Sequence, residues 1–448
     1  MNKRLTFSAT MLLLGASLLM LAQTEQPSST PSSLTLIQAQ DYALKHAFQI
    51  KSAQYDKSSA DFTSDELLGI GLPQVNASVQ YQNFIDLPTS IIPGDFFGAP
   101  GQDVKVQFGV PHQMTVGLSA SQLLFDGTWL VGLQASKAYA ELQRKNITKS
   151  EVEIRAKTAE AYSAALTTQA NVTVLRELLT NMQQLLNDTE AMQKAGYSEQ
   201  QDVDQLMLSV NELMIQIGYT EQYVNITKDL LKFTIGMPLS NVISLTDTWE
   251  SLTTNEGDDM LAFNPSNNID VQIVENGLLM QQLNVKSKKA ALMPNFGAFY
   301  NLQTQGLRDE FDYFDTSMPW FPIQLWGLQL NIPILSGGTK SKTIKKTEVE
   351  VQRLTDMVSM TKEAVQLEYN TATTELSFSK KNMTQAKANL ELAKSILDKE
   401  QVKYREGLSN SFNITQRNQQ VINAQSAYVM AAISHMNAQT KLNKVLNK

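Results

Sequence analysis

The chain has 448 residues, of which 42% are hydrophobic and 18% are charged, and its formal net charge is −7. This mild acidity and the lack of any basic run argue against a nucleic-acid partner. The sequence contains no cysteine, which excludes disulfides, thiolate metal sites, cysteine nucleophiles and a lipid anchor on an N-terminal cysteine. Beyond residue 22 there is no apolar run of about 20 residues, so any part that crosses a membrane must consist of strands.

The N-terminus has the three parts of a secretory signal peptide. Lys3 and Arg4 come before an apolar run from Met11 to Leu21, and small and polar residues follow. We expect residues 1–22 to be a signal peptide that is cleaved after Ala22. The alternative is an uncleaved anchor, although a run this short makes a poor membrane span.

The first half of the chain then changes from a helical to a strand pattern and back. Apolar residues at helical spacing predict a helix or a helix pair over residues 35–68. Strict alternation predicts two strands, each with one apolar and one polar face. Four prolines and four glycines between them predict a long loop over residues 85–112. The first repeat, residues 23–238, thus comprises the leading helix, strands 74–84 and 113–125, a long helix 128–195 and a return helix 201–235.

The long helix is too long to form the core of a compact domain. At 1.5 Å per residue, about 68 residues span roughly 100 Å, so the helix must bury its apolar seam against other helices. Apolar residues of the return helix recur three and four apart, from Val203 through Val210 and Ile217 to Leu231, which is typical of a coiled coil. Because a short turn joins the two helices, we expect an antiparallel hairpin.

The second half presents the same pattern again after a linker over residues 239–268, which we expect to be equatorial and irregular. Gly127 corresponds to Gly337 at an offset of 210, and Gly196 corresponds to Gly407 at an offset of 211, which predicts an internal duplication. In each repeat the leading and return helices together match the long helix in length, so they can pack along its two halves. The second repeat, residues 269–448, comprises a leading helix, strands 295–303 and 325–334 separated by a loop, a long helix 339–406 and a return helix 410–447.

These elements favour an α+β membrane protein that assembles from several copies. Four strands cannot close a barrel, and unpaired strand edges in a bilayer are costly. Three copies would supply twelve strands with aromatic residues near their ends, as in outer-membrane barrels. We therefore expect a trimeric 12-stranded outer-membrane β-barrel, with four strands per chain, continued by a long periplasmic α-helical barrel. Such a tube has the shape of a conduit.

From residue 34 onward the chain resembles the TolC-like outer-membrane efflux protein family. The resemblance includes Leu124-Phe-Asp-Gly and Ile334-Leu-Ser-Gly-Gly before the long helices, and Ile235-Gly-Met-Pro-Leu after the first hairpin. It implies a homotrimeric channel in the outer membrane of a Gram-negative cell, with a periplasmic helical extension. It also implies a periplasmic adaptor (membrane fusion) protein and an inner-membrane transporter as partners, as in tripartite efflux or type I secretion systems.

The resemblance further implies where the adaptor binds. In this family the hairpin tips carry a glycine-centred turn that adaptors grip. A plain helix cap would also use these glycines, and that is the alternative. The matching residues here are Gly196, Tyr197, Ser198, Gly407, Leu408 and Ser409.

An acidic cluster, Glu199, Asp202 and Asp204, lies just past the first tip. Three-fold symmetry would bring these carboxylates together near the pore mouth, where they could favour cations or respond to pH. The alternative is a solvated helix N-terminus that the helix dipole stabilises.

The sequence offers no catalytic, metal or cofactor site. Its three histidines lack metal-ligand spacing, and we expect His435 to be a packing residue on the return helix. The sequence contains no recognisable set of a nucleophile, a base and an orienting group, so we do not expect an enzyme. The alternative to a conduit is a secreted, soluble coiled-coil stalk or adhesin, which would have no use for apolar strand faces.

Overall fold

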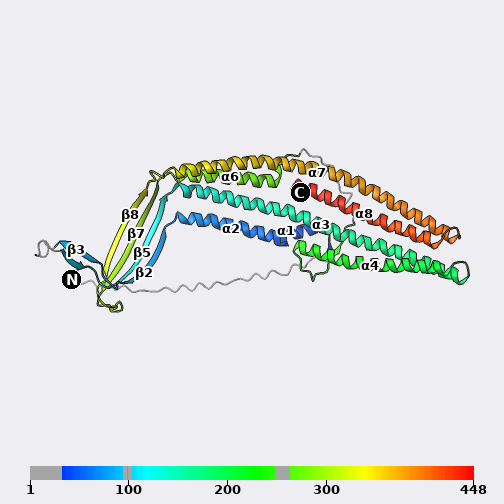
Figure 1. The fold of residues 1–448 in the computed structure, drawn as a ribbon, viewed down its shortest axis with the longest axis horizontal. Coiled ribbons are helices and arrows are strands. Elements are labelled where there is room, and N and C mark those ends of the chain that lie inside the picture. The colour runs from blue at the N-terminus through cyan, green and yellow to red at the C-terminus, as the bar shows by residue number, and fades with distance from the viewer. Residues whose placement is uncertain (1–32, 94–97, 99–102, 249–262) are drawn as a thin grey trace.

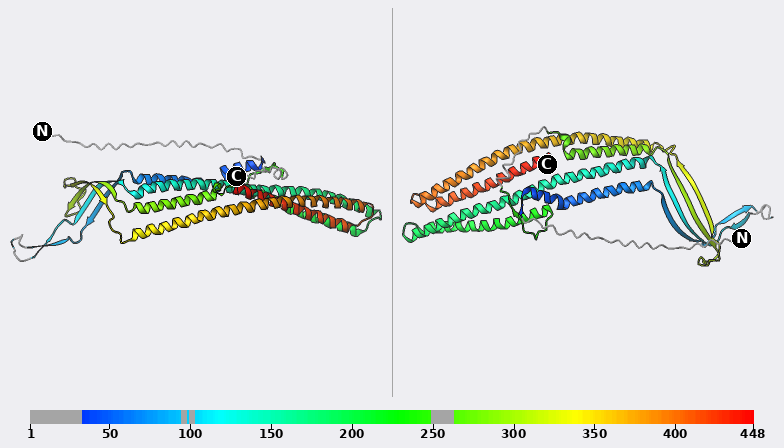
Figure 2. Two further views of the ribbon diagram at one scale, coloured as in Figure 1. Left: turned by 90° about the horizontal axis from the view of Figure 1, so that it is seen from above. Right: turned by 180° about the vertical axis from the view of Figure 1, so that it is seen from behind.

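The computed structural model of the chain describes residues 33–93, 98, 103–248 and 263–448. The predicted signal peptide and residues 249–262 of the predicted linker lie outside the described residues. Figures 1 and 2 show an elongated molecule whose long helices lie side by side in one flattened, curved layer, with a β-sheet at one end. None of the helices in this part of the chain combines the length and the apolar character that crossing a bilayer requires.

Two very long helices, α3 (Gly127–Lys194) and α7 (Thr339–Arg405), run through the helical layer. The Asp126 carboxylate begins α3, because it accepts hydrogen bonds from the backbone N–H groups of Thr128 and Trp129 at 2.6 and 3.0 Å. Other helices are α1 (Leu36–His46), α2 (Phe48–Ile70), α4 (Gln200–Ile235), α6 (Ile269–Ala290) and α8 (Ser411–Val445), with a short 3₁₀ helix, η2 (Pro265–Asn267), before α6.

Shorter helices cover the long ones in two stages. α2 packs along the part of α3 near the sheet and α4 packs along the far part, while α6 and α8 do the same for α7 (Figure 1). This is the packing expected from their lengths. Far from the sheet, α3, α4, α7 and α8 share one apolar core, in which Met182, Leu206, Leu397 and Ile414 are buried. Burial along the whole length stabilises helices that would be marginal in water alone.

Four antiparallel strands form the sheet, in the order β2 (Gln74–Asn83), β5 (His112–Phe125), β7 (Asn295–Arg308) and β8 (Phe321–Asn331). The two halves of the chain therefore meet at β5 and β7, where Ala120 lies opposite Tyr300. β2 and β8 are edge strands with one neighbour each, so the sheet of the single chain is open. The trimer, the twelve-stranded barrel and the duplication stay predictions.

The loop predicted over residues 85–112 is wrong in part. It contains a second hairpin of β3 (Thr89–Pro93) and β4 (Asp103–Gln107), in which Ile91 lies opposite Lys105. Short runs of β-branched residues form these strands, and the surrounding prolines and glycines obscured them. The loop predicted between the strands of the second repeat is also shorter, because β7 continues to Arg308 and β8 already begins at Phe321. At its other end, β8 stops at Asn331, before the predicted residue 334.

The predicted leading helix is a pair that breaks at Ala47, where the backbone is extended. Gly236, the C-cap residue of α4, has a φ of +76° and lies against this break. A Cβ at Gly236 would lie 2.3 Å from the carbonyl oxygen of His46, so only glycine fits.

A small two-stranded unit fixes the start of the described chain to α3. β1 (Ser33–Leu34) pairs in parallel with β6 (Ser244–Leu245). The hydroxyl of Tyr162, which is fully buried on α3, lies 2.9 Å from both the carbonyl oxygen of Leu34 and the carboxylate of Asp247. Burial and the neighbouring Asp247 carboxylate raise the pKa of Tyr162, which keeps its hydroxyl protonated.

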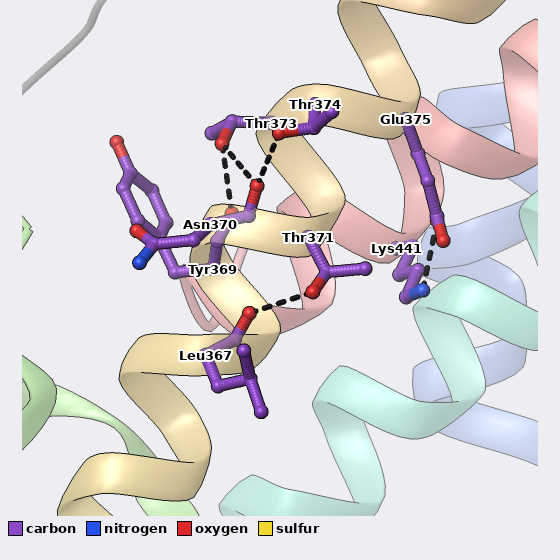
Figure 3. Close-up of polar contacts among 8 residues, drawn as sticks. All are labelled: Leu367, Tyr369, Asn370, Thr371, Thr373, Thr374, Glu375 and Lys441. Atoms are coloured by element: carbon purple, nitrogen blue, oxygen red, sulfur yellow. Dashed lines mark hydrogen bonds and ion pairs between the residues drawn. The ribbon is translucent and has the colours of Figure 1, made fainter.

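Threonine hydroxyls in the middle of α7 find their hydrogen-bond acceptors within the helix itself. Figure 3 shows the hydroxyls of Thr371, Thr373 and Thr374 turned back to carbonyl oxygens one turn earlier, at 2.8, 3.0 and 2.8 Å. The Lys441 ammonium of α8 reaches the Glu375 carboxylate at 2.8 Å and links the two helices. This stretch of α7 can therefore face water.

Candidate functional site

The two hairpin tips lie at the end of the helical layer farthest from the sheet (Figure 1). α3 turns into α4 at Gly196 and α7 turns into α8 at Gly407, with φ of +82° and +70°. The backbone N–H groups of Tyr197 and Leu408 donate to carbonyl oxygens in the last turn of the preceding helix, at 2.9 and 2.8 Å. Both tips are thus the same Schellman-type turn, for which the left-handed glycine is required.

The residue after each glycine is apolar and exposed. Tyr197 is 86% exposed and Leu408 is 77% exposed. In a Schellman turn this residue frequently packs back onto its own helix. Neither side chain does so here, so the helix cap explains the glycines but leaves the apolar residues without a structural role in the single chain.

Asp202 connects the two tips. Its carboxylate accepts hydrogen bonds from the hydroxyl of Ser411, at 2.5 Å, and from the hydroxyl of Ser198, at 3.1 Å. Ser411 begins α8, which lies 209 positions further along the chain. Partial burial raises the pKa of Asp202, but the hydrogen bonds from Ser411 and Ser198 lower it by more, so this carboxyl titrates below its ordinary value of 3.8.

The other predicted tip residues make local contacts. Ser409 donates its hydroxyl to the Glu400 carboxylate at 2.5 Å. The Asp204 carboxylate accepts from the Gln200 amide at 2.8 Å, and Glu199 begins α4 as its N-cap residue. Of the three predicted acidic residues, Asp202 is thus engaged with the second hairpin, and Asp204 is engaged along its own helix.

A groove of about 460 Å³ lies between the first tip and the start of α8. One wall comes from the start of α4 and the other from the start of α8, and the exposed ring of Phe412 lies at its edge. The residues that line it include Tyr197, Ser198, Glu199, Asp202, Asn410, Ser411 and Phe412. Within the described residues there is no group of three side chains that could hold a metal ion.

Sequence reasoning missed Ser411, Phe412 and Glu400 at this site. Ser411 and Asp202 are far apart in sequence, and no pattern in a single sequence pairs them. Phe412 could have been recognised as a candidate binding residue from the sequence. It is the second residue of a return helix and lies outside the apolar seam, so packing within the hairpin does not explain an aromatic ring there.

The two faces of the sheet form a second functional surface. One face of β2 carries Val75, Ala77, Val79 and Tyr81, and the same face continues through Leu118 and Tyr300 to Trp326, Leu328 and Leu330 of β8. Many of these side chains are exposed, and Trp326 is 74% exposed.

The opposite face is polar on β2 and β5. It presents Asn76, Ser78 and Gln80 of β2 beside Ser119 and Thr115 of β5. On β8 this face also carries Ile323 and Leu325, for which the single chain offers no explanation. The sheet therefore has a broad apolar face that no part of the described chain covers at its centre, and a largely wet face behind it.

The sequence matches no family model, and no curated protein matches it closely. Solved structures do match. CusC is 13% identical with a TM-score of 0.73 over 92% of this chain and 91% of that chain. The CmeC outer membrane channel of Campylobacter jejuni is 15% identical with a TM-score of 0.71, over 92% of this chain and 85% of that chain. The MtrE outer membrane channel of Neisseria gonorrhoeae, in its open state, is 14% identical with a TM-score of 0.70, over 92% and 88%.

At these identities the likeness is one of fold, and it extends over nearly the whole described chain. The fold is that of the TolC-like outer-membrane efflux channels, as the sequence motifs predicted.

Proposed function

We propose that three copies of this chain form a passive conduit through the outer membrane, as the outer component of a tripartite efflux or type I secretion-type system. The apolar face of the open sheet is the single observation that carries this proposal. A folded water-soluble protein rarely leaves so wide an apolar surface uncovered. In a bilayer, the same surface would face the lipid acyl chains.

The dimensions of the sheet fit this role. β2 has 10 residues, which corresponds to about 34 Å of extended strand and matches a tilted transmembrane strand. Both edge strands have unpaired backbone groups on one side, and a bilayer offers these groups no water. Pairing β2 of one copy with β8 of the next closes the sheet, and three copies give the twelve strands expected from the sequence.

The helices support assembly as well. The seam of α4 is buried against α3, but a second apolar stripe on α4 is exposed in the single chain. It consists of Leu208, Ile215, Tyr219, Ile226, Leu230 and Phe233. A helix that is apolar on two sides is buried on two sides. A neighbouring copy in a closed helical barrel would supply the missing cover.

The exposed Tyr197 and Leu408 support adaptor docking at the tips. A periplasmic adaptor that binds these side chains would separate the two hairpins and widen the pore, while the inner-membrane transporter supplies the energy. Glu199, Asp202 and Asp204 would all contribute negative charge near the pore mouth, because the hydrogen bonds that Asp202 accepts keep its carboxylate ionised. Neutralising all three carboxylates should reduce cation preference in conductance measurements, and an unchanged preference would rule out the pore role.

Fractionation and cross-linking test the proposal. The chain has no cysteine, so Ser78→Cys on β2 and Gln329→Cys on β8 introduce unique reactive sites on the two edge strands. We expect the double variant to fractionate with the outer membrane and to give covalent trimers with a short bifunctional maleimide, whereas each single variant gives at most dimers. A soluble secreted stalk would leave the chain outside the membrane fraction and would give no trimers.

A further inference from the structure

The connection between β7 and β8, residues 309–320, lies at the end of the sheet farthest from the helices (Figure 1). Gly306 of β7 lies in register with Met114 of β5, which lies in register with Tyr81 of β2. These three residues form one row on the apolar face of the sheet. A Cβ at Gly306 would meet the ring of Tyr313 at 2.9 Å and that of Trp320 at 3.3 Å. The connection therefore folds back over the apolar face.

Aromatic rings hold the connection against the strands. Tyr81 makes edge-to-face contacts with Phe311 and Tyr313, with ring centroids 5.3 and 6.0 Å apart. The ring of Tyr313 also lies beside that of Trp320, at 5.9 Å. Tyr81 of β2 and three residues of the connection thus share one aromatic cluster.

A buried cation fixes this cluster in place. Arg308 is only 2% exposed, and its guanidinium lies 5.7 Å from the Tyr313 ring and 5.9 Å from the Trp320 ring. Its Nη1 donates to the carbonyl oxygens of Leu307 and Pro319, at 3.0 and 2.9 Å. Its Nε forms an ion pair with the Asp312 carboxylate at 3.0 Å, which neutralises the buried charge.

The outer surface of the folded connection is apolar at its centre. Phe314 is 88% exposed and Phe311 is 53% exposed, with their ring centroids 6.2 Å apart, and Met318 is exposed as well. This surface continues the apolar face of the sheet at its outer end. Asp309, Glu310 and Asp315 flank it, which keeps the connection at an aqueous boundary.

We propose that the β7–β8 connection is an interfacial membrane anchor, which inserts Phe314 and Phe311 into the headgroup region of the outer leaflet, rather than a loop extended into the medium. Aromatic side chains favour this region because one part of the ring meets acyl chains and another meets water. The inference rests on the proposed barrel. The β3–β4 hairpin, which starts at the same end of the sheet, extends away from it (Figure 1), and we expect it to remain in water.

Spin labelling tests the anchor. Because the chain has no cysteine, a nitroxide label can be attached to Phe314→Cys in the full chain reconstituted into phospholipid vesicles. Leu328→Cys on the apolar face of β8 serves as the lipid control, and Ser90→Cys on the β3–β4 hairpin serves as the aqueous control. Collisions of each label with oxygen, which dissolves in lipid, and with a water-soluble nickel chelate are then compared.

We expect the label at position 314 to collide more with oxygen than with the chelate, at a shallower depth than the label at 328. Adding Arg308→Ala should release the connection and shift the label toward the chelate. A label at 314 that behaves like the one at 90, or one shielded from both reagents by a second copy of the chain, would overturn the anchor while leaving the barrel intact. A label at 328 that reports water would instead refute the proposed function.

Discussion

Removing the Asp202 carboxylate should loosen the two hairpin tips from each other. In Asp202→Ala, the hydroxyls of Ser411 and Ser198 lose their charged acceptor. A hydrogen bond to a charged group contributes about 1.5–3 kcal/mol, and the partly exposed position and the longer second bond place this one near the lower end. We estimate a loss of about 1.5–2.5 kcal/mol in the local free energy of opening, which corresponds to an opening equilibrium constant that is about 10- to 70-fold larger.

Hydrogen exchange measured by mass spectrometry on the assembled protein gives the readout. Peptides that cover the starts of α4 and α8 should both exchange faster in Asp202→Ala, because the lost bond joins them. Asp204→Ala is the matched control, since its only described partner is Gln200 on the same helix. The reasoning fails if the two variants change exchange equally, or if only the α4 peptide responds in Asp202→Ala.

The pH dependence of the tips has a definite sign. The folded-state pKa of Asp202 is below its ordinary value of 3.8, so its contribution to stability is fully present above that ordinary value, which the unfolded chain has. That contribution is lost as the pH falls through the lower folded-state value. Tip exchange, corrected for intrinsic rates, should therefore stay constant between about pH 8 and pH 5 and should rise only in stronger acid. A transition near pH 6 would contradict this assignment.

Three further substitutions test other parts of the structure. Leu408→Asp should abolish cross-linking to the periplasmic adaptor and leave the trimer intact, because this exposed side chain has no role in the fold; normal cross-linking would remove the docking proposal. Gly236→Ala should cost more than about 2 kcal/mol of stability, because the backbone at this position is left-handed and a Cβ would contact the His46 carbonyl. Gly132→Ala on α3 is the control and should be neutral or stabilising, and thermal unfolding in detergent compares the two variants. Tyr162→Phe should cost only about 1 kcal/mol in the same assay, since the acceptors of its hydroxyl keep other donors.

The sequence predicts the fold because its main signals are local. Asp126 caps α3 and Gly196 ends it, and these two residues set the ends of a 68-residue helix. The alternation of apolar and polar residues marks the strands, and the apolar residues of each alternating run identify the apolar face of the sheet. The TolC-like fold predicted from short motifs is confirmed by the similarity to solved channels, although the identity is only 13–15%.

The features that the sequence did not reveal depend on contacts between distant residues. The break at Ala47 lies against Gly236, which is far away in sequence, and the link between Asp202 and Ser411 joins the two halves of the chain. The β3–β4 hairpin was missed because the four prolines and four glycines of residues 85–112 hide the short runs of β-branched residues in its two strands. The folded β7–β8 connection depends on Arg308, whose burial among aromatic rings no spacing rule predicts.

The number of copies in the purified protein tests the central claim most directly. Light scattering on the full chain in detergent should give a mass of three chains after subtraction of the bound detergent, and removal of the detergent should cause aggregation because the apolar face of the sheet loses its cover. A monomer that stays in solution without detergent would contradict the account.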